Sequence, residues 1–182
     1  MRRSLIKEAR GVGAGPQGLK EKDMDERYMK EALNEAQKAM DLGEVPIGAI
    51  IVDNESGEII GRGFNRRNSA KNPLCHAEID AINEAAGVIG DWRIEKCTLY
   101  VTIEPCPMCA GAIVQARIPR VVFGARNPKA GCAGSILDIL NEDRFNHQVD
   151  VTEGVLKDEC AAFMKAFFKR FRKNRQESEA NG

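Results

Sequence analysis

The chain has 182 residues, of which 43% are hydrophobic and only 5% aromatic, and this composition predicts one domain with a mostly aliphatic core. Its 27 basic and 27 acidic residues balance to a formal charge of zero, so any nucleic-acid site would have to be a local patch. The six cysteines, two of them in a C-x-x-C motif, favour a reducing, cytoplasmic setting over a disulfide framework.

Both ends of the chain are expected to lie outside the folded domain. Residues 1–24 are rich in glycine with scattered charges, and they contain no apolar stretch typical of a secretory signal or a membrane span. We therefore expect a disordered N-terminal extension at 1–24 and a disordered tail at 176–182. The folded domain is predicted to cover residues 25–175.

The first half of this domain is expected to contain helices around a hairpin. Apolar residues recurring at intervals of three and four predict a helix from Asp25, and Gly43 is a typical stop signal just past its end. The elements expected after it are strands at 46–52 and 58–63, a polar loop at 65–75, a helix at 76–86, a strand at 97–103 and a helix at 108–116.

The second half continues the alternation of strands and helices. The elements expected there are a strand at 119–123, a Gly- and Ala-rich loop at 124–135, a short helix or turn at 136–140, a strand at 149–155 and a final helix at 158–175. This order indicates an α/β fold in which helices cover a sheet.

Two short motifs about thirty residues apart carry the chemistry. His76-Ala77-Glu78 and Pro105-Cys106-Pro107-Met108-Cys109 supply one imidazole, two thiolates and one carboxylate. An imidazole and two thiolates suit zinc, and three protein ligands leave a coordination position open for water. Both motifs fall where the chain enters a predicted helix, and the partial positive charge of a helix N-terminus favours the thiolate that zinc requires.

The fourth side chain of these motifs is expected to move protons. Glu78 lies two positions from His76, need not bind the metal, and can pass a proton from water to a leaving nitrogen. A closed structural zinc site is the alternative, and it requires a fourth protein ligand, for which Cys75, Cys132 and His147 are the candidates.

The order of the motifs, His-Ala-Glu followed by Pro-Cys-x-x-Cys, resembles the signature of zinc-dependent nucleoside and nucleobase deaminases. The resemblance extends to the family of bacterial tRNA adenosine deaminases over residues 25–175. The further segments that carry it are 44–49, 64–66, 98–102, 117–124 and Gly134-Ser135, with the motifs extended to 76–79 and 104–111.

This resemblance implies a three-layer α/β/α cytidine-deaminase-like fold with a central five-stranded mixed sheet. It also implies a homodimer that converts adenosine to inosine at wobble position 34 of a tRNA anticodon, using a zinc-bound hydroxide and a glutamate proton shuttle. The expected partner is the anticodon stem-loop of an arginine tRNA with an ACG anticodon, and no membrane is expected.

The resemblance also implies residue roles. His76, Cys106 and Cys109 would bind one Zn²⁺ per subunit, and Glu78 would be the catalytic proton shuttle. Asn65 is expected to hydrogen-bond the target base. Further substrate contacts are expected from Ala77, Arg126 and Asn127.

The motifs identify deamination better than they identify the base. A small-molecule cytosine or guanine deaminase and a non-catalytic zinc-binding RNA module therefore remain alternatives. The final predicted helix carries a basic cluster that either contacts RNA phosphates or forms a solvated helix end, made up of Lys165, Lys169, Arg170, Arg172, Lys173 and Arg175. His147 either contacts RNA or is an exposed loop residue.

Overall fold

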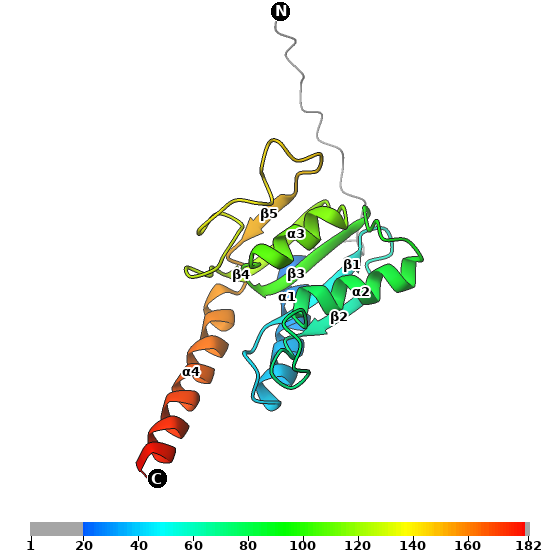
Figure 1. Ribbon diagram of the computed structural model, residues 1–182. Coiled ribbons are helices and arrows are strands. Elements are labelled where there is room, and N and C mark those ends of the chain that lie inside the picture. Colours follow the sequence, from blue (N-terminus) through cyan, green and yellow to red (C-terminus); the bar gives the residue numbers. More distant parts are fainter. Residues whose placement is uncertain (1–19, 181–182) are drawn as a thin grey trace, which may run out of the picture.

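A computed structural model describes residues 20–180, with side chains through Lys173. Four helices and five strands make up this part of the chain (Figure 1). In chain order they are α1 (Glu21–Asp41), β1 (Gly48–Asp53), β2 (Ile59–Phe64), α2 (Ala77–Ile89), β3 (Cys97–Ile103), α3 (Pro107–Gln115), β4 (Arg120–Ala125), β5 (Asp150–Glu153) and α4 (Lys157–Ala180).

The strands form one mixed sheet in the order β2-β1-β3-β4-β5. Strand β1 is antiparallel to both β2 and β3, whereas β3, β4 and β5 run parallel to one another. The predicted five-stranded mixed sheet is therefore confirmed. Because β3 and β4 are parallel, α3 crosses between them and starts at the carboxyl end of β3, where the cysteine motif lies.

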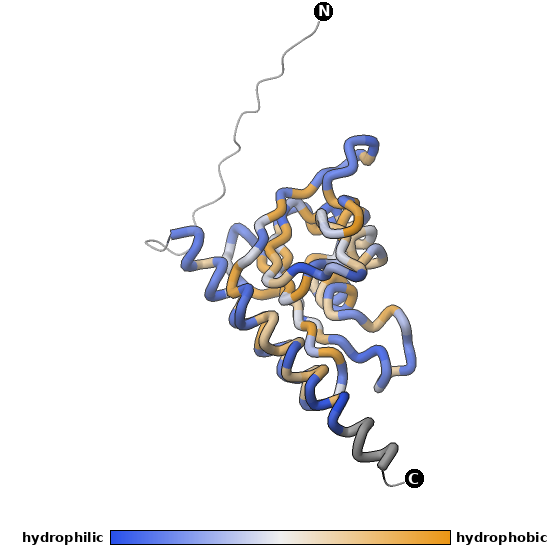
Figure 2. The backbone as a smooth tube through the Cα atoms, turned by 90° about the vertical axis from the view of Figure 1, so that its left-hand side faces the viewer, coloured by the Kyte–Doolittle hydropathy of each residue, from blue (hydrophilic) through white to orange (hydrophobic). Residues whose placement is uncertain are grey.

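The core consists of two apolar clusters, one on each face of the sheet. One cluster joins α2 and α3 to alternate residues of the central strands, such as Leu99 and Val101. The other joins α1 and α4 to the strand residues that face the opposite side of the sheet, such as Tyr100 of β3 and Val122 of β4. Helices thus cover both faces, as the predicted three-layer α/β/α arrangement requires, and Figure 2 shows hydrophobic residues concentrated in the middle of the molecule.

The start of α2 packs tightly against strand β2. A Cβ atom added to Gly63 would overlap the backbone carbonyl of Ala77, and one added to Gly61 would overlap that of Ala81. The two glycines therefore let the helix lie directly on the strand. This close approach fixes the first turn of α2, which carries two of the predicted site residues.

The terminal boundaries differ from the expected ones. Helix α1 begins at Glu21, so residues 21–24 belong to the domain, and acidic Glu21 and Asp23 in its first turn complement the helix dipole. Helix α4 continues to Ala180, beyond the expected end at 175. The rest of the predicted N-terminal extension, at 1–19, and the last two residues of the predicted tail lie outside the described residues.

The segment predicted as a short helix or turn at 136–140 contains no helix, but it does contain bends and a turn around an isolated bridge between Ala133 and Asp138, so the turn alternative holds. Within residues 20–180, no helix has the length and apolarity needed to cross a bilayer.

Candidate metal centre and its surroundings

The three predicted metal ligands converge at the N-termini of α2 and α3. His76 is the residue just before α2, Cys106 is the residue just before α3, and Cys109 lies in the first turn of α3. The Nδ1 atom of His76 is 3.6 Å from the Sγ atom of Cys106 and 3.5 Å from the Sγ atom of Cys109. Side chains that are thirty residues apart in the sequence therefore form one cluster.

The spacing of these atoms fits a tetrahedral zinc ion. Zn–S bonds of about 2.3 Å and Zn–N bonds of about 2.0 Å at a tetrahedral angle place the sulfur and nitrogen atoms about 3.5 Å apart. Within the described part of the chain, His76, Cys106 and Cys109 are the one group of such ligand atoms, all within 4.8 Å of one another. The alternative fourth ligands Cys75, Cys132 and His147 are not in it, so a closed four-ligand site is not supported.

The two thiols differ strongly when no metal neutralises them. Hydrogen bonds from Cys109 and His76 lower the pKa of Cys106 to about 4, although burial opposes this shift. The pKa of Cys109 is raised, first because its proton is held in the hydrogen bond to Cys106 and next because the thiol is buried. Zinc binds cysteine as the thiolate, so surroundings that favour the thiolate of Cys106 suit a metal ligand.

Glu78 lies beside this cluster in the first turn of α2. Its side chain is buried, with 4% exposure. Burial, together with the neighbouring Cys106 thiolate, raises the pKa of Glu78 to about 7. A carboxyl group with a pKa near neutral both accepts and releases protons readily at that pH. Glu78 is not part of the group of ligand atoms, as expected for a residue that stays off the metal.

Asn65 follows β2 directly and opens the loop that leads to His76. The residue is 6% exposed, and its backbone N–H donates to the carbonyl of Ile47 at 3.0 Å. The loop after it is pinned in two places. Arg66 forms a two-donor ion pair with Asp80 of α2, and the backbone N–H of Ser69 donates to the carboxylate of Glu44.

The other predicted substrate contacts lie on two different elements. Ala77 is the buried first residue of α2, between His76 and Glu78. Arg126 is exposed at the end of β4, and its guanidinium pairs with Glu153 of β5 at 2.5 Å. Asn127 is half-buried, and its side-chain oxygen accepts hydrogen bonds from the backbone of its own turn.

Comparisons with known proteins agree with this geometry. The MafB19-like deaminase family matches residues 23–172. A tRNA-specific adenosine deaminase from Bacillus subtilis is 52% identical over 157 residues, which cover 86% of this chain and 96% of that protein. The chain belongs to the tRNA-specific adenosine deaminase family.

Other relatives support the same assignment. A deaminase of the same name from Haemophilus influenzae is 43% identical, covering 87% of this chain and 91% of its own length. A solved structure from a study of A-to-I editing by tRNA:A34 deaminases is 39% identical, with a TM-score of 0.71 over 75% of this chain and 98% of that chain. A guanine deaminase from Nitrosomonas europaea, at 20% identity and a TM-score of 0.66 over 90% of this chain and 98% of that chain, shares the fold.

Two buried carboxylates of the deaminase were not singled out from the sequence. Glu104, at the end of β3, is 2% exposed and accepts hydrogen bonds from Asn127, Ala133 and Ser135. Burial alone would raise the pKa of Glu104, but these hydrogen bonds outweigh it and lower the pKa. The sequence signal for Glu104 was an acidic residue directly after an apolar strand.

Glu44 is another buried carboxylate, and its Oε2 is the one buried side-chain oxygen or nitrogen without a hydrogen-bond partner among the described residues.

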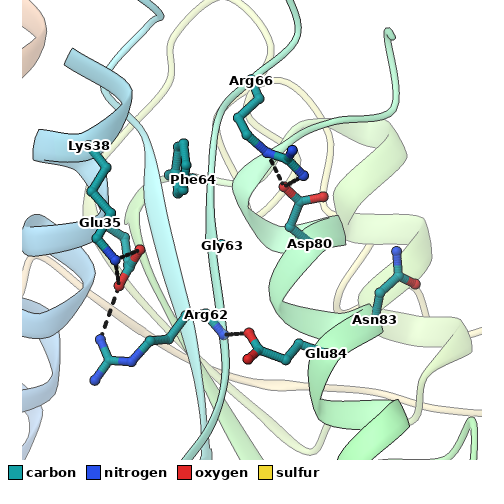
Figure 3. Close-up of a pocket in the computed structure, with 9 residues that line it drawn as sticks. All are labelled: Glu35, Lys38, Arg62, Gly63, Phe64, Arg66, Asp80, Asn83 and Glu84. Carbon is teal, nitrogen blue, oxygen red and sulfur yellow. Dashed lines mark hydrogen bonds and ion pairs between the residues drawn. The ribbon is translucent and has the colours of Figure 1, made fainter. Parts of the chain in front are cut away.

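A separate, open pocket of about 520 Å³ lies between α1, β2 and α2 (Figure 3). None of the three clustered metal ligands lines it. Its charged groups pair with one another, as in the contacts of Glu35 with Lys38 and Arg62. The pocket's paired charges therefore set it apart from the cluster at α2 and α3, which offers three metal-ligand atoms.

The basic cluster of α4 lies on a helix that extends away from the sheet (Figure 1). Its described members from Lys165 to Lys173 are exposed, so phosphates can reach them. His147 is half-buried, and its Nε2 lies 2.7 Å from the backbone carbonyl of Ile118. The interpretation of His147 as a simply exposed residue is therefore wrong, because a contact with the protein backbone holds its ring.

Proposed function

We propose that this protein is a zinc-dependent deaminase that converts adenosine to inosine at wobble position 34 of tRNA. The observation that carries the proposal is the cluster of His76, Cys106 and Cys109, with buried Glu78 beside it and no fourth protein ligand among the described residues. Such a set holds a metal and leaves one position for a reacting water. Membership of a family whose relatives are named tRNA-specific adenosine deaminases supports the choice of substrate.

The proposed chemistry replaces the amino group of adenine by an oxygen from water, with release of ammonia. Zinc held by the three ligands would supply a water whose pKa is lowered to about 7. Glu78 accepts a proton from the attacking water and delivers it to the nitrogen that leaves. Its buried position beside the cluster suits both halves of this task.

The proposed positioning of the base depends on groups around the cluster. Asn65 offers an amide that pairs with the edge of the base, and the protein around it already excludes most water from this side chain. Ala77, Arg126 and Asn127 are the further proposed substrate contacts. The exposed cations of α4 would bind phosphates of the anticodon stem-loop, whose unpaired bases are accessible for insertion into a site.

We further propose a cytoplasmic homodimer with one zinc ion per subunit, acting on an arginine tRNA with an ACG anticodon. The reduced state of all six cysteines is compatible with the cytoplasm. A dimer must bury apolar surface, and Val88, Ile89 and Trp92 at the end of α2 are exposed. Light scattering at micromolar concentration measures the assembly, and a monomeric mass would contradict this part of the proposal.

The substrate is tested by comparing turnover of that tRNA with turnover of free adenosine, cytosine and guanine. Inosine is read as G, so sequencing the treated tRNA should show an A-to-G change at position 34. The guanine deaminase that shares this fold makes a small-molecule activity the second candidate. Deamination of a free base without change in the tRNA would favour that candidate and overturn the proposed substrate.

A further inference from the structure

The chain between β4 and β5 folds around the carboxylate of Glu104. The carboxylate accepts four hydrogen bonds from that segment. The N–H groups of Asn127, Ala133 and Ser135 donate at 2.9, 3.0 and 3.0 Å, and the hydroxyl of Ser135 donates as well. We call residues 126–137 the anchored loop. It begins with Arg126 and Asn127, two of the proposed substrate contacts.

The two carboxylate oxygens together hold both parts of the anchored loop. Oε2 accepts from the N–H of Asn127 at its beginning and from the hydroxyl of Ser135, whereas Oε1 accepts from the N–H groups of Ala133 and Ser135 in its later part. The fit is close, because a Cβ atom added to Gly131 would overlap the carboxyl group of Glu104. One buried side chain therefore fixes both limbs of the loop.

The same loop is joined to the metal-binding turn. The N–H of Cys132 donates to the carbonyl of Pro105 at 2.8 Å, directly before Cys106. The N–H of Glu104 itself donates to the carbonyl of Ala125 at 2.9 Å, so the end of β3 is also tied to the start of the loop. The residue that anchors the loop thus lies two positions from a proposed metal ligand.

We propose that Glu104 is a positioning residue that sets the anchored loop, and with it Arg126 and Asn127, at a fixed distance from the metal-binding turn. This inference rests on the proposed function, because the loop matters for turnover only if it contacts the substrate. Glu104 does not touch the reacting atoms. It acts through the loop that four of its hydrogen bonds hold.

The substitution Glu104→Gln tests the proposal. A glutamine has one carbonyl oxygen, which can still accept from Ala133 and Ser135, while its NH₂ group can donate to the hydroxyl of Ser135. The N–H of Asn127 would then face a donor and lose its acceptor. We expect KM for the tRNA stem-loop to rise about ten-fold while kcat and zinc content change less than about two-fold, because substrate contacts are lost and the metal site is kept.

Glu35→Gln is the matched control. Glu35 is also 2% exposed, but it lies on α1 and holds Lys38 and Arg62 instead of the anchored loop. This variant should lower the melting temperature without raising KM. An equal rise of KM in both variants, or no rise in Glu104→Gln, would overturn the proposal, since Glu104 would then act as an ordinary buried carboxylate or not at all.

Two further measurements keep the test decisive if Glu104→Gln does not fold. The variant Gly131→Ala keeps the carboxylate but pushes the loop away from it, and it should raise KM in the same direction. In the zinc-loaded wild-type protein without RNA, the amides of Asn127, Ala133 and Ser135 should exchange with solvent as slowly as those of β4. Exchange as fast as in the exposed segment 143–146 would contradict the anchoring.

The exchange measurement also separates this inference from the proposed function. If the wild-type protein leaves the tRNA unchanged, the proposed substrate fails, but slow exchange of the three amides still supports the anchoring role of Glu104. If the tRNA is deaminated and the amides exchange rapidly, the proposed function stands and the positioning role is wrong.

Discussion

The metal-ligand cluster at α2 and α3 contrasts with a second polar cluster, on the opposite face of the sheet. There, Arg120 of β4 donates to both carboxylate oxygens of Asp25 in α1, at 2.9 and 2.7 Å. The hydroxyl of Tyr100 donates to the same carboxylate at 2.8 Å, and burial together with that charge raises the pKa of Tyr100. Each charge in this second cluster has its partner within the protein.

The metal-ligand cluster is built differently. It brings together three groups that each offer a ligand atom, and it holds beside them a buried carboxyl group whose pKa is raised to about 7. Burial of polar groups is costly unless their partners are supplied. The comparison teaches that the Asp25–Arg120 cluster pairs fixed opposite charges as a structural feature, whereas the cluster of His76, Cys106 and Cys109 gathers three atoms of the kind that bind a metal ion.

The largest expected effect comes from removing a metal ligand. His76→Ala should abolish detectable turnover and lower the zinc content from one ion per subunit toward zero, because two remaining ligands do not hold the metal tightly. A chelator should have the same effect on the wild-type protein, and added zinc should restore it. Zinc content measured by atomic spectroscopy beside turnover checks this, and full activity in the metal-free protein would contradict it.

Breaking the second cluster should affect stability instead of chemistry. Arg120→Met leaves the carboxylate of Asp25, which is 4% exposed, without its charged partner. We expect the free energy of unfolding to fall by about 3 kcal/mol, while zinc content and turnover per folded molecule stay unchanged. Urea denaturation measures the loss.

The double variant Asp25→Leu with Arg120→Met sharpens the contrast. Replacing both charges by apolar groups should recover part of the lost stability, since no unpaired charge remains. No apolar replacement of His76 and Cys106 should recover turnover. A double variant that is less stable than Arg120→Met alone would show that the second cluster is not the self-contained pair described above.

A smaller effect is expected from Asn65→Ala, which removes a proposed contact with the target base. Loss of one hydrogen bond to the base should lower kcat/KM for the tRNA about ten- to a hundred-fold, with zinc content unchanged. Loss of zinc in this variant would instead indicate that Asn65 holds the 65–75 loop and the approach to His76.

The smallest effect should come from the cations of α4. Changing Lys165 and Lys169 to Gln should weaken RNA binding and reduce the slope of log affinity against log salt by about one per lost phosphate contact. Lys96→Gln is the control, because Lys96 precedes β3 at the end of that strand away from the cysteine motif and pairs with Glu55. An identical salt slope in the α4 variant and the wild-type protein would argue against RNA contact by this helix.

Much of the fold follows from local patterns in the sequence. The β-branched and aromatic run at 97–103 predicts β3 with its observed bounds, and Gly43 adopts the left-handed conformation, with φ of 73°, of a helix stop. The convergence of His76 with Cys106 and Cys109 was also predictable, because the spacing of metal ligands is a strong signal even before the strands between them are placed.

The remaining features depend on contacts between distant residues, which local patterns do not encode. The Asp25–Arg120 pair joins residues 95 positions apart, and it explains why α1 contains a buried acidic residue in its second turn. The roles of Glu44 and Glu104 likewise appear only when the loops that donate to them are in place. Each of them reads in the sequence as an ordinary acidic residue beside an apolar strand.

The most direct test of the central claim, an open zinc site with a separate proton shuttle, is a paired measurement on Glu78→Gln. Glutamine has nearly the same shape as Glu78 but cannot carry protons, and Glu78 is not among the clustered ligand atoms. Zinc content and tRNA affinity should therefore match the wild-type protein, while turnover at position 34 falls by about 10³–10⁴-fold. Retained turnover, or loss of zinc together with activity, would contradict the division of labour between the three ligands and Glu78.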